Sequence, residues 1–226
     1  MKKPARQSAL SFKRRLLAWF RKHARPLPWR STRDAYRVIV SEFMLQQTQV
    51  ARVEEYYPRF LTRYPTVADL ARARPAAVRE SWEGLGYYRR AANLHRLARV
   101  VMKEHSGTIP GDPETLRSLP GVGAYTAGAV ASFAYERREA AVDTNVARVL
   151  ARAFLKAGTR DERRGTNTRR REIWALARAL LPRSGKTAWE FNQALMDLGA
   201  TICVARKPRC EICPVRRQCN TGRQAS

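Results

Sequence analysis

The chain of 226 residues contains 44 lysine and arginine residues but 19 aspartate and glutamate residues, which gives a formal net charge of +25 at pH 7. A positive field of this size favours polyanions, and arginine is suited to bidentate contacts with phosphate. No apolar run approaches the roughly 18 residues that a membrane-spanning helix needs, and the N-terminus lacks the uninterrupted apolar core of a signal peptide. We therefore expect a cytoplasmic, nucleoid-associated protein that binds nucleic acid, with an anionic membrane surface as the alternative target.

Apolar residues recur at helical spacing in almost every segment, as at Leu94, Leu97 and Val101, and sustained strand-like alternation is not apparent. The sequence therefore predicts an all-α protein. In chain order, the predicted helices span residues 9–22, 35–48, 50–63, 67–72, 76–82, 88–105, 114–119, 125–135, 144–157, 169–182 and 187–200. The polar run 158–172 predicts a mobile, solvated loop, whose charge could also contact DNA.

The segment LPGVGAYTAG, residues 119–128, lies between two predicted helices. Gly121 and Gly123 can take backbone angles that other residues avoid, so this turn can close tightly and point successive backbone N–H groups outward. Free N–H groups at a helix N-terminus bind anions. We therefore expect Gly121, Val122 and Gly123 to bind a DNA phosphate.

All the cysteines of the chain lie near its end, at Cys203, Cys210, Cys213 and Cys219, with spacers of six, two and five residues. Such clustering is typical of metal ligands, and two disulfides are not expected in a cytosolic protein. The spacing alone fits a structural zinc ion and an iron–sulfur cluster equally well. Because four thiolates leave no open coordination position, either metal would attach the tail to the fold.

Several motifs together resemble the helix-hairpin-helix DNA glycosylase superfamily, on the branch that holds endonuclease III and the adenine DNA glycosylases. The hairpin LPGVG, the run VDTNV and the cysteine spacing are similar to the whole branch. The motifs LPWR, SEFMLQQTQV, GLGYYRRAANLH and FNQALMDLGATIC are similar to the adenine glycosylases in particular. The resemblance covers residues 10–220.

The resemblance implies two helical lobes with the substrate pocket between them. One is a six-helix domain, residues 35–143, and the other is a cluster domain built from both chain ends, residues 1–34 and 144–226. It also implies that the four cysteines hold a [4Fe–4S] cluster, which leaves structural zinc as the alternative.

Glu42 lies at helical spacing from Val38, Ile39 and Leu45. A carboxyl group among apolar side chains has a raised pKa and can hold a proton near neutrality. The alternative is a glutamate at the helix rim that points to water. The resemblance implies that Glu42 is the acid that protonates adenine at N7 and makes the base a leaving group.

Asp143 precedes the helix predicted from residue 144 and can act as its N-cap. A carboxylate at a helix N-terminus also stays ionised and can face a developing positive charge. Glycosidic cleavage passes through an oxocarbenium-like state. The resemblance assigns Asp143 to stabilising that cation, either electrostatically or covalently, and both roles can hold at once.

Tyr125 follows the hairpin. Similar enzymes that also cut the DNA backbone have a lysine here, whose amine forms a Schiff base with the sugar, and a phenol cannot do this. The resemblance therefore implies a monofunctional glycosylase that leaves an abasic site. Tyr125 would then either hydrogen-bond to Glu42 or line the pocket wall.

Three residues match motif positions near the adenine pocket of the family, namely Trp29, Arg30 and Gln193. They offer stacking and hydrogen bonds to the edge of an extruded base. Trp29 could equally belong to the core.

Gln47, together with Tyr87 or Tyr88, matches the wedge that fills the gap left by the extruded base and probes the opposite base. Aromatic rings can replace the lost stacking. The two tyrosines could instead be core residues. The pair Gln46–Gln47 within QQTQV favours adenine as the excised base.

The resemblance as a whole implies a monomeric enzyme that removes adenine opposite 8-oxoguanine or guanine from duplex DNA. Full-length adenine glycosylases carry a further C-terminal domain that the 226 residues do not include, so we expect either a fragment or a short enzyme. Thr144 stands where many adenine glycosylases have glycine, and a short thymine mismatch glycosylase also pairs a tyrosine with the aspartate. The alternatives are removal of thymine or uracil opposite guanine, and a non-catalytic DNA-binding module.

Overall fold

The computed structural model describes residues 3–155 and 165–224, and all regular structure in these ranges is helical, as predicted. The α-helices are α1 (Lys3–His23), α2 (Ala35–Leu45), α3 (Val50–Arg63), α4 (Val67–Arg72), α5 (Pro75–Glu80), α6 (Arg89–Glu104), α7 (Pro113–Ser118), α8 (Ala124–Phe133), α9 (Thr144–Phe154), α10 (Gly165–Leu180), α11 (Gly185–Thr201) and α12 (Asn220–Gln224). Short 3₁₀ helices are η1 (Pro28–Arg30), η2 (Cys210–Ile212) and η3 (Arg216–Gln218). No helix in the described ranges has the length and apolar character that crossing a bilayer requires.

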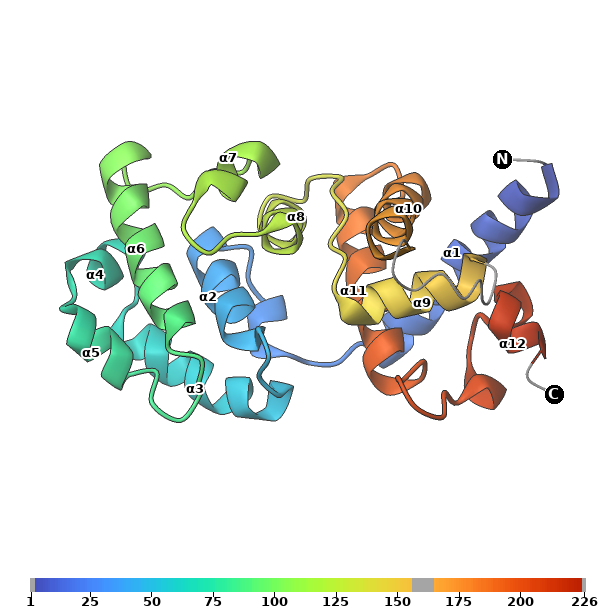
Figure 1. Cartoon of the computed structure of the whole chain (residues 1–226), viewed down its shortest axis with the longest axis horizontal. Helices are drawn as coiled ribbons and strands as arrows, with labels where there is room; N and C mark the ends of the chain where they lie inside the picture. Colours follow the sequence, from blue (N-terminus) through green and yellow to red (C-terminus); the bar gives the residue numbers. More distant parts are fainter. Residues whose placement is uncertain (1–2, 156–164, 225–226) are drawn as a thin grey trace. The chain divides into compact units, whose positions relative to one another are not determined.

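The chain folds into two compact units, and both chain ends belong to the same one. This unit comprises Met1–Arg25 with Glu136–Ser226, and the other comprises Pro26–Tyr135. In Figure 1 the first unit holds the blue helix α1 and the yellow-to-red helices α9 to α12, and the second holds α2 to α8. The sequence-based boundaries fall at 34/35 and 143/144, whereas the observed ones fall at 25/26 and 135/136.

Helix α2 is the central element of the unit Pro26–Tyr135, and it packs against α3, α6 and α8. Asp34 caps its N-terminus by accepting a hydrogen bond from the backbone N–H of Arg37 at 2.8 Å. Every residue from Val38 to Met44 is buried, Glu42 included. The helix therefore presents a carboxyl group to surroundings that are otherwise mostly apolar.

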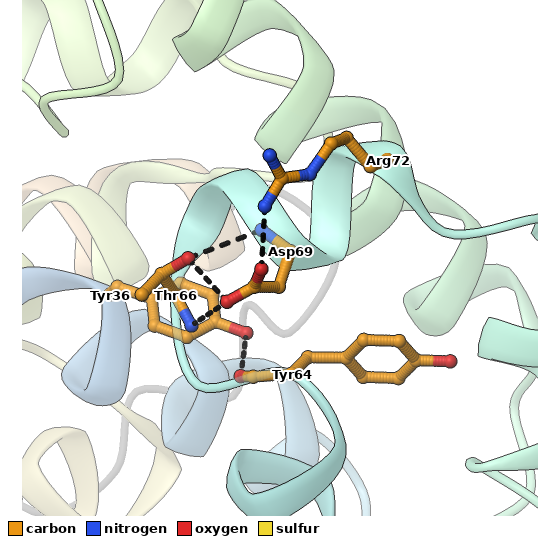
Figure 2. A network of polar contacts seen from close by, with 5 residues as sticks. All are labelled: Tyr36, Tyr64, Thr66, Asp69 and Arg72. Atoms are coloured by element: carbon orange, nitrogen blue, oxygen red, sulfur yellow. Dashed lines mark hydrogen bonds and ion pairs between the residues drawn. The ribbon is translucent and has the colours of Figure 1, made fainter.

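The start of α4 is fixed by side chains that Figure 2 shows together. Thr66 and Asp69 form a capping box, in which each side chain accepts a hydrogen bond from the backbone N–H of the other at 3.2 Å. Arg72 adds an ion pair to Asp69 at 2.7 Å, and hydrogen bonds from the Thr66 hydroxyl and from the Arg72 guanidinium lower the pKa of Asp69. The Tyr36 hydroxyl donates to the Tyr64 carbonyl at 2.8 Å, which ties α2 to the segment before α4.

The predicted helix 35–48 is too long, because α2 ends at Leu45. Gln47 adopts φ +56°, in the left-handed region, which no α-helix of L-residues continues through. Helix α1 in turn begins at Lys3, earlier than the predicted residue 9.

The predicted loop 158–172 is wrong over its second part, because α10 begins at Gly165. The apolar side chains of Ile173, Ala177 and Leu180 are buried at helical spacing, and the helix extends from them through the arginine-rich run toward its N-terminus. Arginine and glutamate are good helix formers, so an exposed charged run can prolong a helix that packing has nucleated. The first part of the predicted loop, up to residue 164, lies outside the described residues.

Candidate active site and metal centre

The hairpin between α7 and α8 depends on Gly121. This residue has φ +79°, and a side chain there would meet Asn93 at 2.8 Å and the Phe43 ring at 2.9 Å, so both conformation and space require glycine. Val122 is buried and anchors the turn.

Gly123 does not use the conformational freedom that glycine offers, because its φ is −92°, and a side chain there would meet nothing within 4 Å. Gly123 is the N-cap of α8 and carries no side chain to cap it. The first N–H groups of α8 therefore lack a capping side chain, which is consistent with the predicted phosphate site.

Glu42 and Tyr125 lie on helices that pack against each other, α2 and α8. Glu42 is 3% exposed, and Tyr125 is half-buried near the start of α8. The structure thus brings these two predicted site residues into one unit.

Trp29 lies in η1 and is buried, with its ring edge-to-face against Tyr57 at a centroid distance of 5.6 Å. This is the core packing that the sequence left as an alternative. Burial raises the pKa of Tyr57 to about 12. Arg30 follows in the same short helix and is half-buried.

The two segments predicted to form the wedge share an unusual backbone geometry. Gln47 has φ +56° and Tyr87 has φ +47°, and a residue other than glycine held in this region costs roughly 1–3 kcal/mol. Gln47 is exposed and Gln46 is half-buried, while Tyr87 and Tyr88 are 58% and 37% exposed. The tyrosines are therefore not core residues, and strain and exposure coincide at the predicted wedge.

Arg90 is a residue that the sequence analysis missed. Its side chain is buried, yet it hydrogen-bonds to both wedge segments, including the carbonyl oxygens of Gln46 and Gly86. With 44 lysine and arginine residues in the chain, no single arginine stands out from the sequence. The signal available in the sequence was the helical register, because Arg90 lies one turn before the buried Leu94 and therefore on the same face of the helix.

Asp143 is the N-cap of α9, as one of its two readings predicted. Its Oδ1 accepts a hydrogen bond from the backbone N–H of Val146 at 2.7 Å, and its Oδ2 accepts one from the Asn145 side chain at 3.1 Å. Both carboxylate oxygens therefore have fixed partners, and the orientation of the group is set by α9 itself.

A chain of hydrogen bonds continues from Asn145 toward the cysteine-bearing tail. The Asn145 amide oxygen accepts from Arg148 at 2.7 Å, and the same guanidinium donates to the carbonyl oxygens of Gly199 and Cys203, both at 2.8 Å. The orientation of Asp143 is thus tied to the backbone of the first cysteine. Gln193, on α11, belongs to this unit and is 5% exposed.

The cysteines Cys203, Cys210, Cys213 and Cys219 line one small cavity next to Arg152. None of the four is in a disulfide. The guanidinium of Arg152 donates to the sulfur of Cys203 at 3.4 Å, and the backbone N–H of Gly222 donates to that of Cys219 at 3.3 Å. Four thiols on one cavity with N–H groups directed at the sulfurs fit a thiolate-bound metal group.

Burial raises the pKa of the Cys213 thiol to about 11, and it also raises that of Cys219. In the part of the chain that the structure describes, no three histidine, cysteine, aspartate or glutamate side chains are placed to hold one metal ion.

Comparison with known proteins agrees with these observations. The family described as HhH-GPD superfamily base excision DNA repair protein matches residues 40–181. The family described as iron-sulfur binding domain of endonuclease III matches residues 203–219, which include all four cysteines. The cofactor is thus a [4Fe–4S] cluster, and the four cysteines that line the cavity are the residues that could hold it.

The chain is also similar to individual proteins. It is 48% identical over 201 residues to the adenine DNA glycosylase of Mycolicibacterium smegmatis, covering 88% of this chain and 66% of that protein. It is 49% identical to the adenine DNA glycosylase of Mycobacterium tuberculosis, covering 88% of this chain and 64% of that protein. The chain thus spans about two thirds of the length of these relatives. A solved structure of a thermostable thymine-DNA glycosylase superposes with a TM-score of 0.87 at 31% identity, covering 97% of this chain and 98% of that one.

Replacing Cys213 with serine is expected to remove the cluster, because serine is a poor ligand for iron and three thiolates leave one iron without its protein ligand. The bound iron and the visible absorption of the purified protein should both fall to a small fraction of their original values. Ile212→Ser, an exposed neighbour in the same tail, is the control and should retain both. Unchanged iron content in Cys213→Ser would remove this cysteine from the ligand set.

Proposed function

Because the chain belongs to the HhH-GPD superfamily of base excision DNA repair proteins, we propose that it is a monofunctional DNA glycosylase that removes mispaired adenine from duplex DNA. The observation that carries the proposal is the contrast between two carboxyl groups. Glu42 is buried on a largely apolar helix, whereas both oxygens of Asp143 accept hydrogen bonds at a helix N-terminus. One acid and one carboxylate in different environments are the pair that glycosidic cleavage uses.

In the proposed reaction Glu42 donates a proton to the adenine ring. Burial away from water favours the protonated form of a carboxyl group, so Glu42 is suited to act as an acid. The C1′–N9 bond then breaks, and its electron pair goes to the protonated base. Neutral adenine leaves, and the deoxyribose becomes an oxocarbenium ion.

Asp143 stabilises this cation through its negative charge, which α9 and Asn145 hold in one orientation. Water then adds to C1′ and gives up a proton, so the products are free adenine and an abasic site. Cys203, Cys210, Cys213 and Cys219 would hold the [4Fe–4S] cluster, which would supply a structural cross-link within the tail.

The proposed partner is double-stranded DNA, bound by one copy of the chain. The net charge of +25 and the uncapped N-terminus of α8 after the hairpin support phosphate binding. The Gln46–Gln47 pair and the identity of 48–49% with adenine glycosylases support adenine as the excised base.

A specific observation supports a second candidate, removal of thymine or uracil from mispairs with guanine. The solved structure of a thermostable thymine-DNA glycosylase superposes on this chain with a TM-score of 0.87 at 31% sequence identity. Thr144, which follows Asp143, also bears on which base is excised, because many adenine glycosylases have glycine at this position.

The two candidates are separated by a panel of duplexes with A opposite 8-oxoguanine, A:G, T:G and U:G, each incubated with the protein and then treated with alkali to cleave abasic sites. The proposal expects strand cleavage at adenine in the first two. Cleavage of T:G and U:G alone would replace it with the second candidate. Absence of cleavage in all four would leave a DNA-binding module.

Borohydride is expected to trap little or no protein covalently on the DNA, because Tyr125 offers no amine for a Schiff base. The measurement is denaturing electrophoresis of a reaction on A opposite 8-oxoguanine in the presence of borohydride. The variant Tyr125→Lys provides the comparison and should trap more. Efficient trapping by the unaltered protein would show that another amine performs lyase chemistry.

A further inference from the structure

Two exposed side chains project from strained backbone on neighbouring segments of one unit. Gln47 and Tyr87 both have positive φ values, of 56° and 47°, although neither is glycine, asparagine or aspartate. Exposed residues gain little from packing, so this strain persists only if other contacts fix the backbone around them. The side chain of Arg90 supplies contacts of this kind to both segments.

On the side of Gln47, the Arg90 guanidinium binds the end of α2. Its Nη1 donates to the carbonyl oxygens of Phe43 at 3.1 Å, Met44 at 2.7 Å and Gln46. The last carbonyl groups of a helix lack partners within the helix, and a cation at this end also interacts favourably with the helix dipole. Arg90 therefore caps α2 and fixes the chain where it enters Gln47.

The second amino group, Nη2, joins the two segments. It donates to the Thr48 hydroxyl at 2.9 Å, directly after Gln47. It also donates to the carbonyl oxygens of Leu85 and Gly86, both at 3.1 Å, directly before Tyr87. A single planar group thus holds the residues that flank both strained positions.

The Arg90 guanidinium is itself enclosed. Arg90 is 6% exposed, and its guanidinium carbon lies 5.4 Å from the centroid of the Tyr87 ring and 5.6 Å from that of Trp82. The partners of this guanidinium are carbonyl and hydroxyl oxygens and aromatic rings, and desolvation by burial lowers the pKa of Arg90. A buried cation held by neutral groups orders those groups, and removing it would leave several buried carbonyl oxygens unsatisfied.

We propose that Arg90 is a positioning residue that holds Gln47 and Tyr87 as one rigid pair, which enters the base stack when the target nucleotide is extruded. The DNA-bound part of this inference rests on the proposed glycosylase function. Arg90 acts through these two side chains and touches neither the excised base nor the sugar. Lysine cannot replace it, because one ammonium group cannot reach six oxygens on two segments.

The test compares Arg90→Lys with Arg89→Lys, the same substitution at the adjacent exposed residue. Single-turnover excision is measured on adenine opposite 8-oxoguanine and on adenine opposite a tetrahydrofuran abasic analogue, where the target base is already unpaired. An unpaired base needs less help to leave the stack. Arg90→Lys should lower the excision rate on adenine opposite 8-oxoguanine by roughly 10²-fold, the loss that a small misplacement of functional groups causes. On adenine opposite the abasic analogue the excision rate should fall by less than about 3-fold.

Retained excision of the unpaired adenine also shows that the variant is folded. Equal losses on both substrates, or no loss on the paired one, would overturn the proposal. In a background with Gln47→Ala and Tyr87→Ala, Arg90→Lys should have no additional effect on the paired substrate, because the residues it positions are absent. A full additional loss there would also contradict the proposed role.

A readout independent of cleavage separates this inference from the proposed function. In a duplex with 2-aminopurine as the target base, binding of the unaltered protein should raise the fluorescence as the base unstacks. Arg90→Lys should lose most of this rise, and Arg89→Lys should keep it. An unchanged rise in Arg90→Lys would overturn the inference, whereas failure of the unaltered protein to excise adenine would overturn only the proposed function.

Discussion

Replacing Asp143 with asparagine is expected to lower the rate of adenine release by roughly 10³-fold, the scale of losing a fixed charge that faces the transition state. Asparagine caps helices as well as aspartate does, so the hydrogen bond from Val146 and the start of α9 should survive. The substitution thus removes the negative charge together with the hydrogen bond that Oδ2 accepts from the Asn145 side chain, because an amide NH2 group cannot accept one. Single-turnover excision on A opposite 8-oxoguanine measures the loss, and a mobility-shift assay should show that mismatch binding is largely retained.

Asp34→Asn is the matched control, because Asp34 is also a helix N-cap that accepts a backbone hydrogen bond three residues later. Its rate should stay within about 2-fold of the unaltered protein, since the cap is kept and no reacting charge is lost. A rate within about 10-fold for Asp143→Asn would remove the carboxylate from the mechanism.

Replacing Glu42 with glutamine is expected to slow excision by about 10²–10⁴-fold, the range for losing a general acid. Glutamine has nearly the same size and keeps the buried position on α2 filled, but it has no proton that it can transfer to the base. The measurement is single-turnover excision, with thermal unfolding to show that the midpoint stays near that of the unaltered protein. Glu54→Gln, on the exposed face of α3, should leave the rate unchanged.

Normal turnover by Glu42→Gln would mean that another group protonates the base. A loss of activity accompanied by a large drop in the unfolding midpoint would instead assign Glu42 a structural role in the core of its unit.

Elements with local start and stop signals were predictable from the sequence. Helices 50–63 and 67–72 have the predicted bounds, and the second is fixed by the capping box of Thr66 and Asp69 within its first turn. The N-cap role of Asp143 is local in the same sense. Such features need only a few neighbouring residues, so one sequence is enough to place them.

Features set by distant contacts were not predictable in the same way. The end of α2 at Leu45 depends on a guanidinium from α6, more than 40 residues later in the sequence, and on the left-handed conformation of Gln47. The start of α10 at Gly165 depends on packing further along that helix, which overrides the polar composition of the run.

The candidate site likewise combines features that the local sequence predicts with features that only distant contacts create. The motifs supplied the residue types, and the cysteine spacing predicted a shared metal group, which the common cavity of the four thiols supports. The spacing could not reveal that Asn145 and Arg148 connect Asp143 to the backbone of Cys203. That connection joins residues in the first turns of α9 to a segment some 55 positions later, and only the folded unit brings them together.

The central claim is that this chain releases adenine from a mispair by hydrolysis. It is tested most directly by incubating the protein with a duplex containing A opposite 8-oxoguanine and identifying the small product by chromatography and mass spectrometry. We predict free adenine in an amount equal to the abasic sites formed, with the DNA strand intact until alkali is added. Absence of free adenine, with thymine or uracil released instead from T:G or U:G duplexes, would contradict it.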